Sequence, residues 1–269
     1  MTKARLVVIT NGNYFARLIL DDLFREYADA ISGVLVITGD YKARAGLRAV
    51  WAIGKSTAFP YLIYKIFTLV VFRIGQIFLN KKIFTVNKLA EHYDVPVYEA
   101  VAVNSDEALN WVAAHSPDLL VSVSCPQMIK RKMLSLASHG GINIHSSLLP
   151  AYAGLAPYFW VLSAGEKVAG TTVHYMTLKF DEGNILVQKT LEIKPRESTF
   201  NLFKRLAELG SPALLAAVES ALAGNPGTKQ DMTRYTYFSN PTFSSYLELR
   251  KRGHRLLRPG DLITAVRAE

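Results

Sequence analysis

The chain has 269 residues, of which half are hydrophobic and a fifth are charged. A chain of this length and composition buries a substantial core, which excludes a mainly disordered protein and favours one large domain, or one domain with an appendage. The formal net charge of +9 is local, because eight Lys or Arg residues and no acidic residue lie between Tyr41 and Lys82, and this excludes a basic coat over the whole surface.

Two features of the sequence predict a cytoplasmic protein. Cys125 is the single cysteine, so the chain cannot form an internal disulfide. The N-terminal run MTKARLVVIT enters an apolar, strand-like segment at once, where a secreted protein would have a signal segment with a cleavage site.

Strands and helices alternate in the first half of the chain. Leu6 to Thr10 and Gly33 to Thr38 are apolar, β-branched runs of the kind buried on both faces of a parallel sheet, and Phe15 to Tyr27 between them has helical spacing. These three segments predict a βαβ unit. The further expected elements are helices at 87–92 and 106–114, the second with Ser105 as N-cap, and strands at 96–98 and 119–124.

The second half of the chain continues this alternation and adds a hairpin. Two alternating segments, 171–177 and 185–193, are joined through FDEGN and predict paired strands. The other expected elements are a short helix at 130–137, a strand at 142–145, helices at 200–209 and 212–223 with Ser198 or Thr199 as N-cap, and a helix at 243–252.

Three polar residues are candidates for chemistry. Asn143 and His145 are two residues apart on a predicted strand, so their side chains project from the same face near the strand end. Asp181 lies in the turn of the neighbouring hairpin. Each residue also has an ordinary structural explanation, since Asn and His satisfy loop backbone groups and Asp is a common turn former. Their combination favours a site.

The segments around these residues match a known family. NIHSSLLPAYAG, followed by VHYMTLKFDEGNIL with Asp181 about 36 residues after His145, resembles the folate-dependent formyltransferases. That family includes glycinamide ribonucleotide, methionyl-tRNA and nucleotide-sugar formyltransferases and formyltetrahydrofolate hydrolase. The resemblance covers roughly residues 1 to 222. It implies an α/β fold with a Rossmann-like, mostly parallel sheet flanked by helices over 1–223, a basic and apolar helical insertion at about 41–82, and a C-terminal appendage at 224–269.

The resemblance also implies a reaction and its catalytic residues. The formyl donor is 10-formyltetrahydrofolate, the acceptor is an amine, and no metal is required. The family's catalytic trio falls on Asn143, His145 and Asp181. An amine attacking the formyl carbon creates an oxyanion, which the amide of Asn143 and an N–H of His145 are suited to stabilise, while Asp181 orients the imidazole and helps to accept the amine proton.

Binding residues carried over from the family fall on three segments. Cys125, Pro126, Gln127, Met128 and Ile129 on one side and Leu178, Lys179 and Phe180 on the other are expected to surround the folate. Core packing stays an alternative for Met128 and Ile129, and Cys125 is not expected to act as a nucleophile. Asn11, Gly12, Asn13 and Tyr14 are expected to contact the acceptor. The segment TNGNYF has a single glycine, which is not a phosphate cradle and disfavours a ribonucleotide acceptor.

The expected acceptor is a small molecule with an amino group, with a nucleotide-linked amino sugar as the first choice. Methionyl-tRNA is the first alternative, because the basic segment follows the second strand as it does in that type of enzyme. It is less favoured, since about 46 residues after Ala223 are too few for the C-terminal barrel of those enzymes. Hydrolysis of the formyl donor, and a non-catalytic folate-binding or membrane-associated module, stay open as further alternatives.

The segment 59–79 is apolar and long, and it predicts one or two helices. Lys65 and Arg73 interrupt it on one face, and an apolar stripe runs through Leu62, Ile66, Val70, Ile74 and Ile77. We expect this stripe to be covered by the same chain or by a second subunit of a homodimer. Peripheral contact with a membrane surface is the alternative, and a membrane span is disfavoured by the charged residues.

Overall fold

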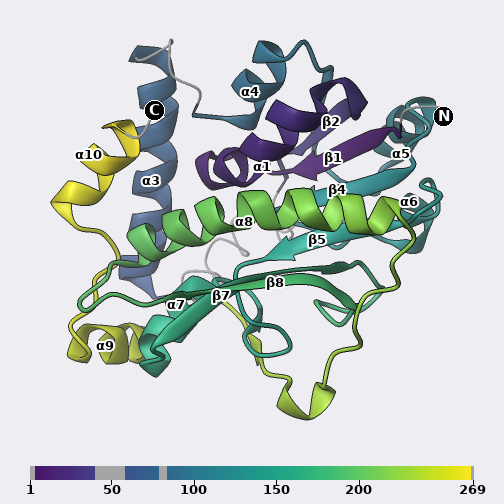
Figure 1. Cartoon of the computed structure of the whole chain (residues 1–269). Coiled ribbons are helices and arrows are strands. Elements are labelled where there is room, and N and C mark those ends of the chain that lie inside the picture. Colours follow the sequence, from purple (N-terminus) through teal and green to yellow (C-terminus); the bar gives the residue numbers. More distant parts are fainter. Residues whose placement is uncertain (1–3, 40–57, 79–83, 268–269) are drawn as a thin grey trace.

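A seven-stranded sheet, flanked on both faces by helices, is the centre of the fold (Figure 1). The computed structural model describes residues 4–39, 58–78 and 84–267. The strand order is β3-β2-β1-β4-β5-β7-β8; neighbours from β3 to β5 are parallel, and β7 and β8 continue the sheet in antiparallel pairing. The strands are β1 (Leu6–Thr10), β2 (Ile31–Ile37), β3 (Val97–Ala100), β4 (Leu119–Val123), β5 (Gly141–His145), β7 (Val168–Tyr175) and β8 (Ile185–Glu192). This arrangement confirms the predicted Rossmann-like, mostly parallel α/β fold.

The central strands are buried because helices cover both of their faces. Side chains alternate across β1, so Leu6 and Val8 join the larger hydrophobic core while Val7 and Ile9 join a smaller one. All four are fully buried, which is why the strand sequences are continuous apolar runs.

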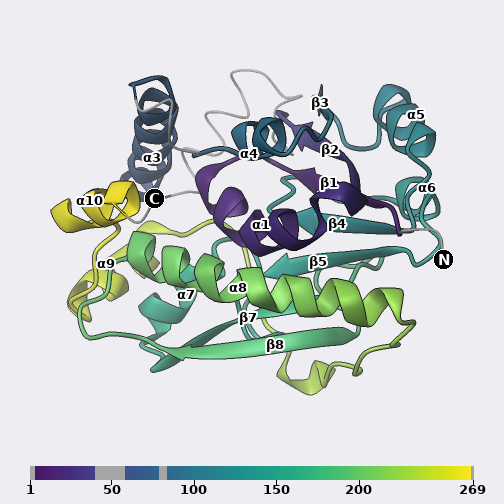
Figure 2. The same cartoon turned by 45° about the horizontal axis from the view of Figure 1, so that its top comes forward.

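Helices of the larger core lie on one face of the sheet and those of the smaller core on the other (Figure 2). The helices near the larger core are α1 (Tyr14–Tyr27), α3 (Phe59–Phe78), α4 (Val86–His92), α7 (Pro157–Ala164) and α8 (Thr199–Leu222). The smaller core is closed by α5 (Asp106–Ala114) and α6 (Arg131–Leu134). The N-caps predicted for α5 and α8 are confirmed, since Ser105 and Ser198 accept hydrogen bonds from the first turns of these helices.

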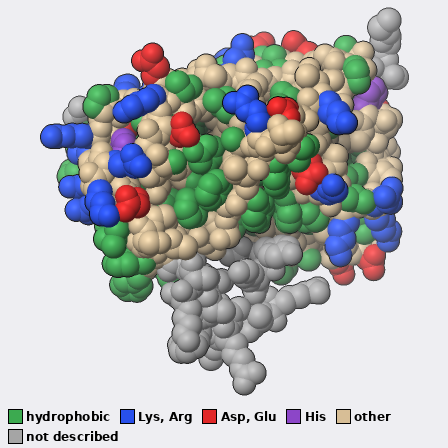
Figure 3. All heavy atoms as spheres, turned by 90° about the horizontal axis from the view of Figure 1, so that it is seen from below, with side chains coloured by type: hydrophobic (Ala, Val, Ile, Leu, Met, Phe, Trp, Pro, Cys, Tyr) green, Lys and Arg blue, Asp and Glu red, His purple; other side chains and the backbone are tan. Residues whose placement is uncertain are grey.

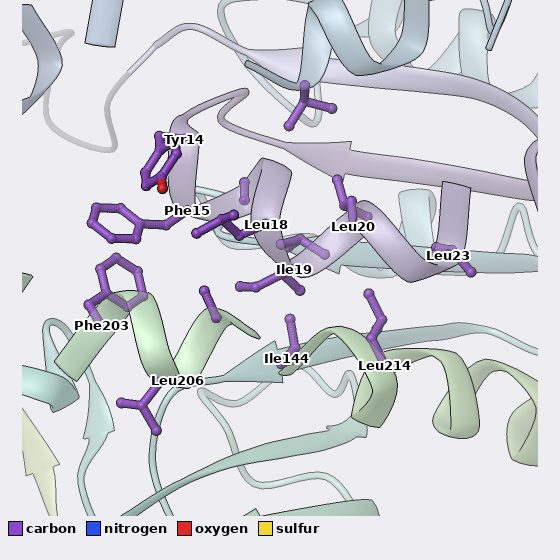
Figure 4. Packing of buried hydrophobic residues seen from close by; sticks show 14 of the residues in the cluster. Tyr14, Phe15, Leu18, Ile19, Leu20, Leu23, Ile144, Phe203, Leu206 and Leu214 are labelled. Carbon is purple, nitrogen blue, oxygen red and sulfur yellow. The ribbon is translucent and has the colours of Figure 1, made fainter. Parts of the chain in front are cut away.

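Among the described helices, α1 and α8 form the most extensive contact (Figure 4). Phe15 of α1 stacks on Phe203 of α8 with 4.0 Å between ring centroids. The prediction of two helices at 200–209 and 212–223 is wrong, because α8 is continuous and contains Pro212. Leu206 and Leu214, on the two sides of this proline, both pack into the same core. Tertiary packing on α1 therefore outweighs the local cost of a proline inside the helix.

Helix α3 differs from its prediction in the face that it buries. The segment forms one helix, and the side chains turned to the domain are those of Tyr61, Tyr64, Thr68 and Phe72. Most of the predicted stripe faces outward instead: Ile66, Val70, Ile74 and Ile77 are 43–73% exposed. Within the described residues the same chain does not cover this stripe, because the aromatic residues of α3 take the buried positions. Cover by a second subunit stays a prediction.

The C-terminal segment packs onto the domain through several short elements. Strand β9 (Tyr237–Phe238) pairs with β6 (Ala153–Gly154), and the segment also contains η3 (Met232–Arg234), α9 (Phe243–Lys251) and α10 (Pro259–Arg267). A further short helix, η1 (Ala28–Ala30), follows α1. Ser198 donates a hydrogen bond to the buried carboxylate of Asp261 at 2.6 Å, which ties α10 to the start of α8. The division at residue 223 into a domain and an appendage stays a prediction.

We predict that Phe200→Ala lowers the free energy of unfolding by about 3–5 kcal/mol, because Phe200 is fully buried and its removal leaves a cavity. Its ring contacts those of Phe15 and Phe72, with centroids 5.3 and 6.0 Å away. Phe243→Ala is the matched control, since Phe243 is 58% exposed and its loss should cost about 0.5 kcal/mol or less. Urea unfolding measures both values. Equal losses for the two variants would contradict the packing described above.

Candidate active site

A row of polar side chains crosses three neighbouring strands near the carboxyl end of β5. Strand register places Ser122 of β4 beside Asn143 of β5, and Asn143 beside His174 of β7. The Ser122 hydroxyl donates to Asn143 Oδ1 at 2.9 Å, and Asn143 Nδ2 lies 3.3 Å from His174 Nε2. His174 Nδ1 is 2.9 Å from the carbonyl oxygen of Tyr175. This row fixes the orientation of the Asn143 amide, whose nitrogen points toward β7.

His145 is nearly buried at the last position of β5, two residues beyond Asn143. Its Nε2 donates to the carbonyl oxygen of Tyr152 at 3.0 Å, and its Nδ1 lies 3.8 Å from Asp181 Oδ2. Both ring nitrogens therefore face oxygen acceptors, an arrangement in which both can donate only when the ring is protonated. The structure thus brings together the three residues that the sequence analysis singled out.

The carboxylate of Asp181 lies between two histidines. Oδ2 accepts a hydrogen bond from the Gly154 N–H at 2.9 Å, and Oδ1 lies 3.6 Å from His174 Nε2. Desolvation by burial raises the pKa of Asp181, but the positive charges of His145 and His174 and the hydrogen bonds from His174 and Gly154 lower it by more. The net pKa is well below the usual range, so Asp181 is ionised at neutral pH.

The backbone around this carboxylate is held in an uncommon conformation. Asp181 has φ +56° and Tyr152 has φ +59°, both in the left-handed region that non-glycine residues seldom adopt. Gly154 has φ +94°, and a Cβ there would lie 2.3 Å from the carbonyl oxygen of Phe238. The close approach between Gly154 and β9 therefore requires glycine.

Gln230, from the C-terminal segment, supports the backbone of the same turn. Its Nε2 donates to the carbonyl oxygens of Asp181 and Gly183, both at 2.7 Å, and the side chain is buried. Sequence reasoning missed this residue, because nothing in the sequence near Gln230 indicates contact with a turn about 50 positions earlier.

Sequence reasoning also missed His174 and Ser122. A signal for His174 was present: it lies in an alternating strand seven residues before Asp181 and has the chemistry of a proton carrier or charge partner. Ser122 lies in a run of apolar residues, and only the register of β4 against β5 places it beside Asn143.

The first segment expected to contact folate serves mainly to connect loops. Gln127 Nε2 donates to the carbonyl oxygens of Gly39 and Val101, both at 2.7 Å, and its Oε1 accepts from the Val103 N–H at 3.0 Å. This side chain therefore holds the chain ends after β2 and β3 together beside the loop after β4. Pro126 and Met128, on either side of it, are half-buried.

Two other residues of that segment face the smaller core. Ile129 is a buried member of this core, and Cys125 packs against it. Burial raises the pKa of the Cys125 thiol to about 11, against a lowering effect of its hydrogen bond to the Gln127 carbonyl. The thiol is therefore protonated at neutral pH, which agrees with the expectation that Cys125 is not a nucleophile.

The second expected folate segment is exposed. Leu178 and Phe180 are 45% and 44% exposed, and Lys179 forms an ion pair with Glu182 at 3.2 Å. Figure 3 shows the molecule from below the view of Figure 1: hydrophobic side chains gather in a hollow in the middle of this face, and Lys and Arg side chains stand toward its left and right margins. Among residues 4–39, 58–78 and 84–267, no group of three or more His, Cys, Asp or Glu residues is arranged to hold a metal ion.

The loop after β1 satisfies its own backbone donors. The N–H groups of Gly12 and Asn13 donate to the side chains of Thr10 and Asn11, each at 3.2 Å, and Asn13 Oδ1 caps α1 by accepting from the Ala16 N–H at 2.9 Å. These donors are therefore not directed at a phosphate. Of the four expected acceptor residues, Asn11 and Asn13 are half-buried and Gly12 is buried.

Tyr14, the fourth of them, lies in the core. It is 2% exposed and its ring stacks on Phe72 of α3 with 4.1 Å between centroids.

Comparison with known proteins identifies the family. The family model described as Formyl transferase matches residues 4–218. The chain belongs to this family. Membership confirms the family that the sequence predicts.

Proteins named for different acceptors resemble this chain. Methionyl-tRNA formyltransferase of Staphylococcus aureus (strain Newman) is 35% identical over 156 residues, which are 58% of this chain and 50% of that protein. The chain thus matches about half the length of the curated relatives. Glycinamide ribonucleotide transformylase 1 from Symbiobacterium toebii has a TM-score of 0.59 at 19% identity, covering 86% of this chain and 95% of that chain.

A third relative is an N-formyltransferase from Helicobacter canadensis in complex with folinic acid and dTDP-3-aminofucose. Its TM-score is 0.56 at 15% identity, covering 88% of this chain and 71% of that chain. At these identities the two solved structures share the fold with this chain, and they do not select an acceptor.

We predict that the Asp181 carboxylate makes stability depend on pH. Because its pKa is lower in the folded than in the unfolded chain, the ionised group stabilises the fold above its unfolded pKa of about 4, and this contribution is lost as pH falls toward the folded value. Asp181→Asn lacks this group. Wild type should therefore lose more unfolding free energy than Asp181→Asn between about pH 5 and about pH 3.

Asp94→Asn is the matched control for this experiment. Asp94 has φ +55°, as Asp181 does, but it is exposed. Urea unfolding of the three proteins across this pH range gives the comparison. If Asp181→Asn loses stability as steeply as wild type and Asp94→Asn do, the ionic contacts of Asp181 do not contribute to the fold.

Proposed function

We propose that this chain transfers a formyl group from 10-formyltetrahydrofolate to the amino group of an acceptor. The observation that carries this proposal is the cluster of Asn143, His145 and Asp181 at the carboxyl end of β5, in a chain of the formyl transferase family. The cluster offers an amide N–H, an imidazole and a buried, ionised carboxylate within a few ångströms. These are the groups that stabilise an oxyanion and move a proton.

The proposed reaction begins with attack of the acceptor nitrogen on the formyl carbon. The carbonyl oxygen becomes an oxyanion, which accepts an N–H of Asn143 Nδ2, the amide oxygen being held by Ser122. His145 Nε2–H donates to the same oxyanion in place of the Tyr152 carbonyl. The Asp181 carboxylate stabilises the positive charge that His145 carries when both of its ring nitrogens are protonated.

The tetrahedral species then collapses into products. The bond between the formyl carbon and N10 of the folate breaks, the acceptor nitrogen loses a proton, and N10 gains one. Asp181 and His145 are the groups placed to pass this proton, directly or through water. The products are a formamide and tetrahydrofolate. The hydrophobic hollow of Figure 3 supports folate binding on this face, because a flat heteroaromatic ring favours an apolar site with a few polar groups.

We propose a small amine as the acceptor, with a nucleotide-linked amino sugar as the first choice. The loop after β1 disfavours a ribonucleotide whose phosphate would bind at the N-terminus of α1. The side chain of Asn13 already accepts the Ala16 N–H there. Methionyl-tRNA is the second candidate, and the 35% identity with a methionyl-tRNA formyltransferase favours it. Water is the third acceptor to test, since its attack would release formate.

We predict that an amino-sugar nucleotide is formylated with a kcat/KM at least about tenfold above that of methionyl-tRNA, a difference of about 1.4 kcal/mol in transition-state binding. The assay follows tetrahydrofolate release from 10-formyltetrahydrofolate with each acceptor and with none. A higher kcat/KM for methionyl-tRNA at physiological salt would show that methionyl-tRNA is the acceptor. Stoichiometric formate in the absence of any amine would assign hydrolysis.

We also predict that Asn143→Ala, His145→Ala and Asp181→Ala each lower kcat by about 100-fold or more, while the Kd for 5-formyltetrahydrofolate changes much less. The reason is that these groups act on charge that develops only in the transition state. His139→Ala is the control, because His139 is exposed and precedes β5 at its opposite end. Near wild-type kcat in all three variants would remove the trio from the mechanism without deciding the acceptor.

A further inference from the structure

Helix α3 presents an extended apolar face that the described chain leaves uncovered. Its buried side is the narrow row of Tyr61, Tyr64, Thr68 and Phe72, each less than 9% exposed. The opposite side carries large hydrophobic side chains that are 43–73% exposed: Phe59, Ile63, Ile66, Phe67, Leu69, Val70, Ile74 and Ile77. We call these eight residues the α3 outer face. Monomeric soluble proteins seldom expose contiguous apolar surface of this kind without a partner for it.

The inner side of α3 is firmly attached to the domain. Phe72 stacks on Tyr14 with 4.1 Å between ring centroids and an angle of 7°, and it also stacks on Phe200. The hydroxyl groups of Tyr61 and Tyr158 are 3.1 Å apart and hydrogen-bonded. At the start of the helix, the Ala58 N–H donates to the Pro241 carbonyl at 2.7 Å. The outer face is therefore presented by a helix that the domain holds in place.

Length and hydropathy alone would also permit α3 to cross a bilayer. Among the described residues it is the one helix that meets that test, over Phe59–Ile77 with a mean hydropathy of 1.2. A span would separate the inner side of α3 from Tyr14, Phe200 and Tyr158, and it would bring Lys65 into the hydrocarbon. A helix that stays attached and exposes one face fits the interfacial arrangement instead.

The positive charge in and around α3 indicates which kind of partner the α3 outer face binds. Lys65 is exposed on α3, and the helix contains no Asp or Glu. In the sequence, no acidic residue occurs between Asp40 and Glu91, whereas this stretch contains nine Lys or Arg residues. Apolar side chains accompanied by positive charge are the composition that binds bilayers with anionic headgroups.

We propose that the α3 outer face docks this protein on the surface of an anionic lipid bilayer. The aliphatic and aromatic side chains enter the boundary between headgroups and acyl chains, and Lys65 contacts lipid phosphates. The other occupant to consider is a second copy of the chain. A twofold interface would bring α3 and its exposed Lys65 against a copy of themselves, and the helix has no Asp or Glu to offset the like charges. Anionic lipid has the complementary charge.

The docking face lies at the end of the molecule toward which β1 and β5 run, and where α3 and α10 are side by side (Figures 1 and 2). Tyr158, which bonds to Tyr61, belongs to α7, the helix that follows the Gly154 loop of the site. A bilayer on α3 therefore borders the end of the sheet where the proposed catalytic residues lie. Docking itself does not depend on the proposed reaction, and the experiment below requires neither folate nor acceptor.

The test is cosedimentation of the full chain with vesicles of phosphatidylcholine, with and without about 30% phosphatidylserine. We expect pelleting with the anionic vesicles that weakens as salt rises, and little pelleting with phosphatidylcholine alone. Ile66→Ser combined with Ile74→Ser should weaken binding at least about tenfold. Lys65→Gln should weaken it about fivefold and reduce its salt dependence.

A matched double variant controls for the loss of exposed aliphatic side chains. Val101→Ser with Val168→Ser removes two residues that are 69% and 43% exposed on other elements, and it should bind as wild type does. Thermal unfolding checks that each variant is folded. A Phe67→Trp variant supplies an independent reading, because its fluorescence should be quenched by lipids with brominated acyl chains only if the outer face enters the bilayer.

Four results would overturn the proposal. The first is absence of binding to anionic vesicles together with unquenched Phe67→Trp fluorescence. The second is equal binding by the α3 double variant and its control. The third is a lipid-free dimer, seen by sedimentation velocity, that Ile66→Ser with Ile74→Ser dissociates, since the face would then belong to a second copy. The fourth is protein that stays in the membrane fraction after alkaline carbonate extraction, which would show that α3 spans the bilayer.

Discussion

The largely buried carboxylate of Asp181 is the constraint on which the arrangement of the site depends. An ionised carboxylate out of water is costly unless charged or hydrogen-bonding partners surround it. Here the partners come from three segments: His145 at the end of β5, His174 in β7 and the Gly154 N–H in the loop between them. The antiparallel strand β7 therefore has to lie directly beside β5, and the loop after β5 has to fold back over the strand end. Displacing any one of these segments would leave the charge underpaired.

The same constraint connects the C-terminal segment to the chemistry. Asp181 has a left-handed backbone, which the chain keeps only if neighbouring contacts determine it. Gln230 supplies two such contacts by donating to the carbonyl oxygens of Asp181 and Gly183. Strand β9 adds another, because it pairs with the strand that contains Gly154. A segment that the sequence describes as an appendage thus supports the turn on which the proposed catalytic carboxylate lies.

The sequence predicts the parts of this molecule that depend on local pattern. Spacing two residues apart places Asn143 and His145 on one face of a strand, and apolar runs and caps predict most of the sheet and helices. The orienting partners Ser122 and His174 depend on the register between strands, and single strands do not encode their register. The prediction that a helix ends before Pro212 is wrong for a related reason. Packing against α1 stabilises α8 as one helix that includes this proline. In each case a long-range contact decides what a local rule leaves open.

Helix α3 shows how two apolar faces of one helix differ in chemistry. A rule based on hydrophobicity alone selects the aliphatic face through Ile66, Val70 and Ile74 for burial, yet the domain buries the face with Tyr61 and Phe72. Aromatic rings stack on other rings, and tyrosine hydroxyls find partners such as Tyr158, so this face makes specific contacts with a protein. Branched aliphatic side chains gain little from such specificity and pack equally well against acyl chains. A mainly aromatic inner side and a mainly aliphatic outer side, with Lys65 exposed on the same helix, are therefore the composition expected of a helix that meets protein on one side and lipid on the other.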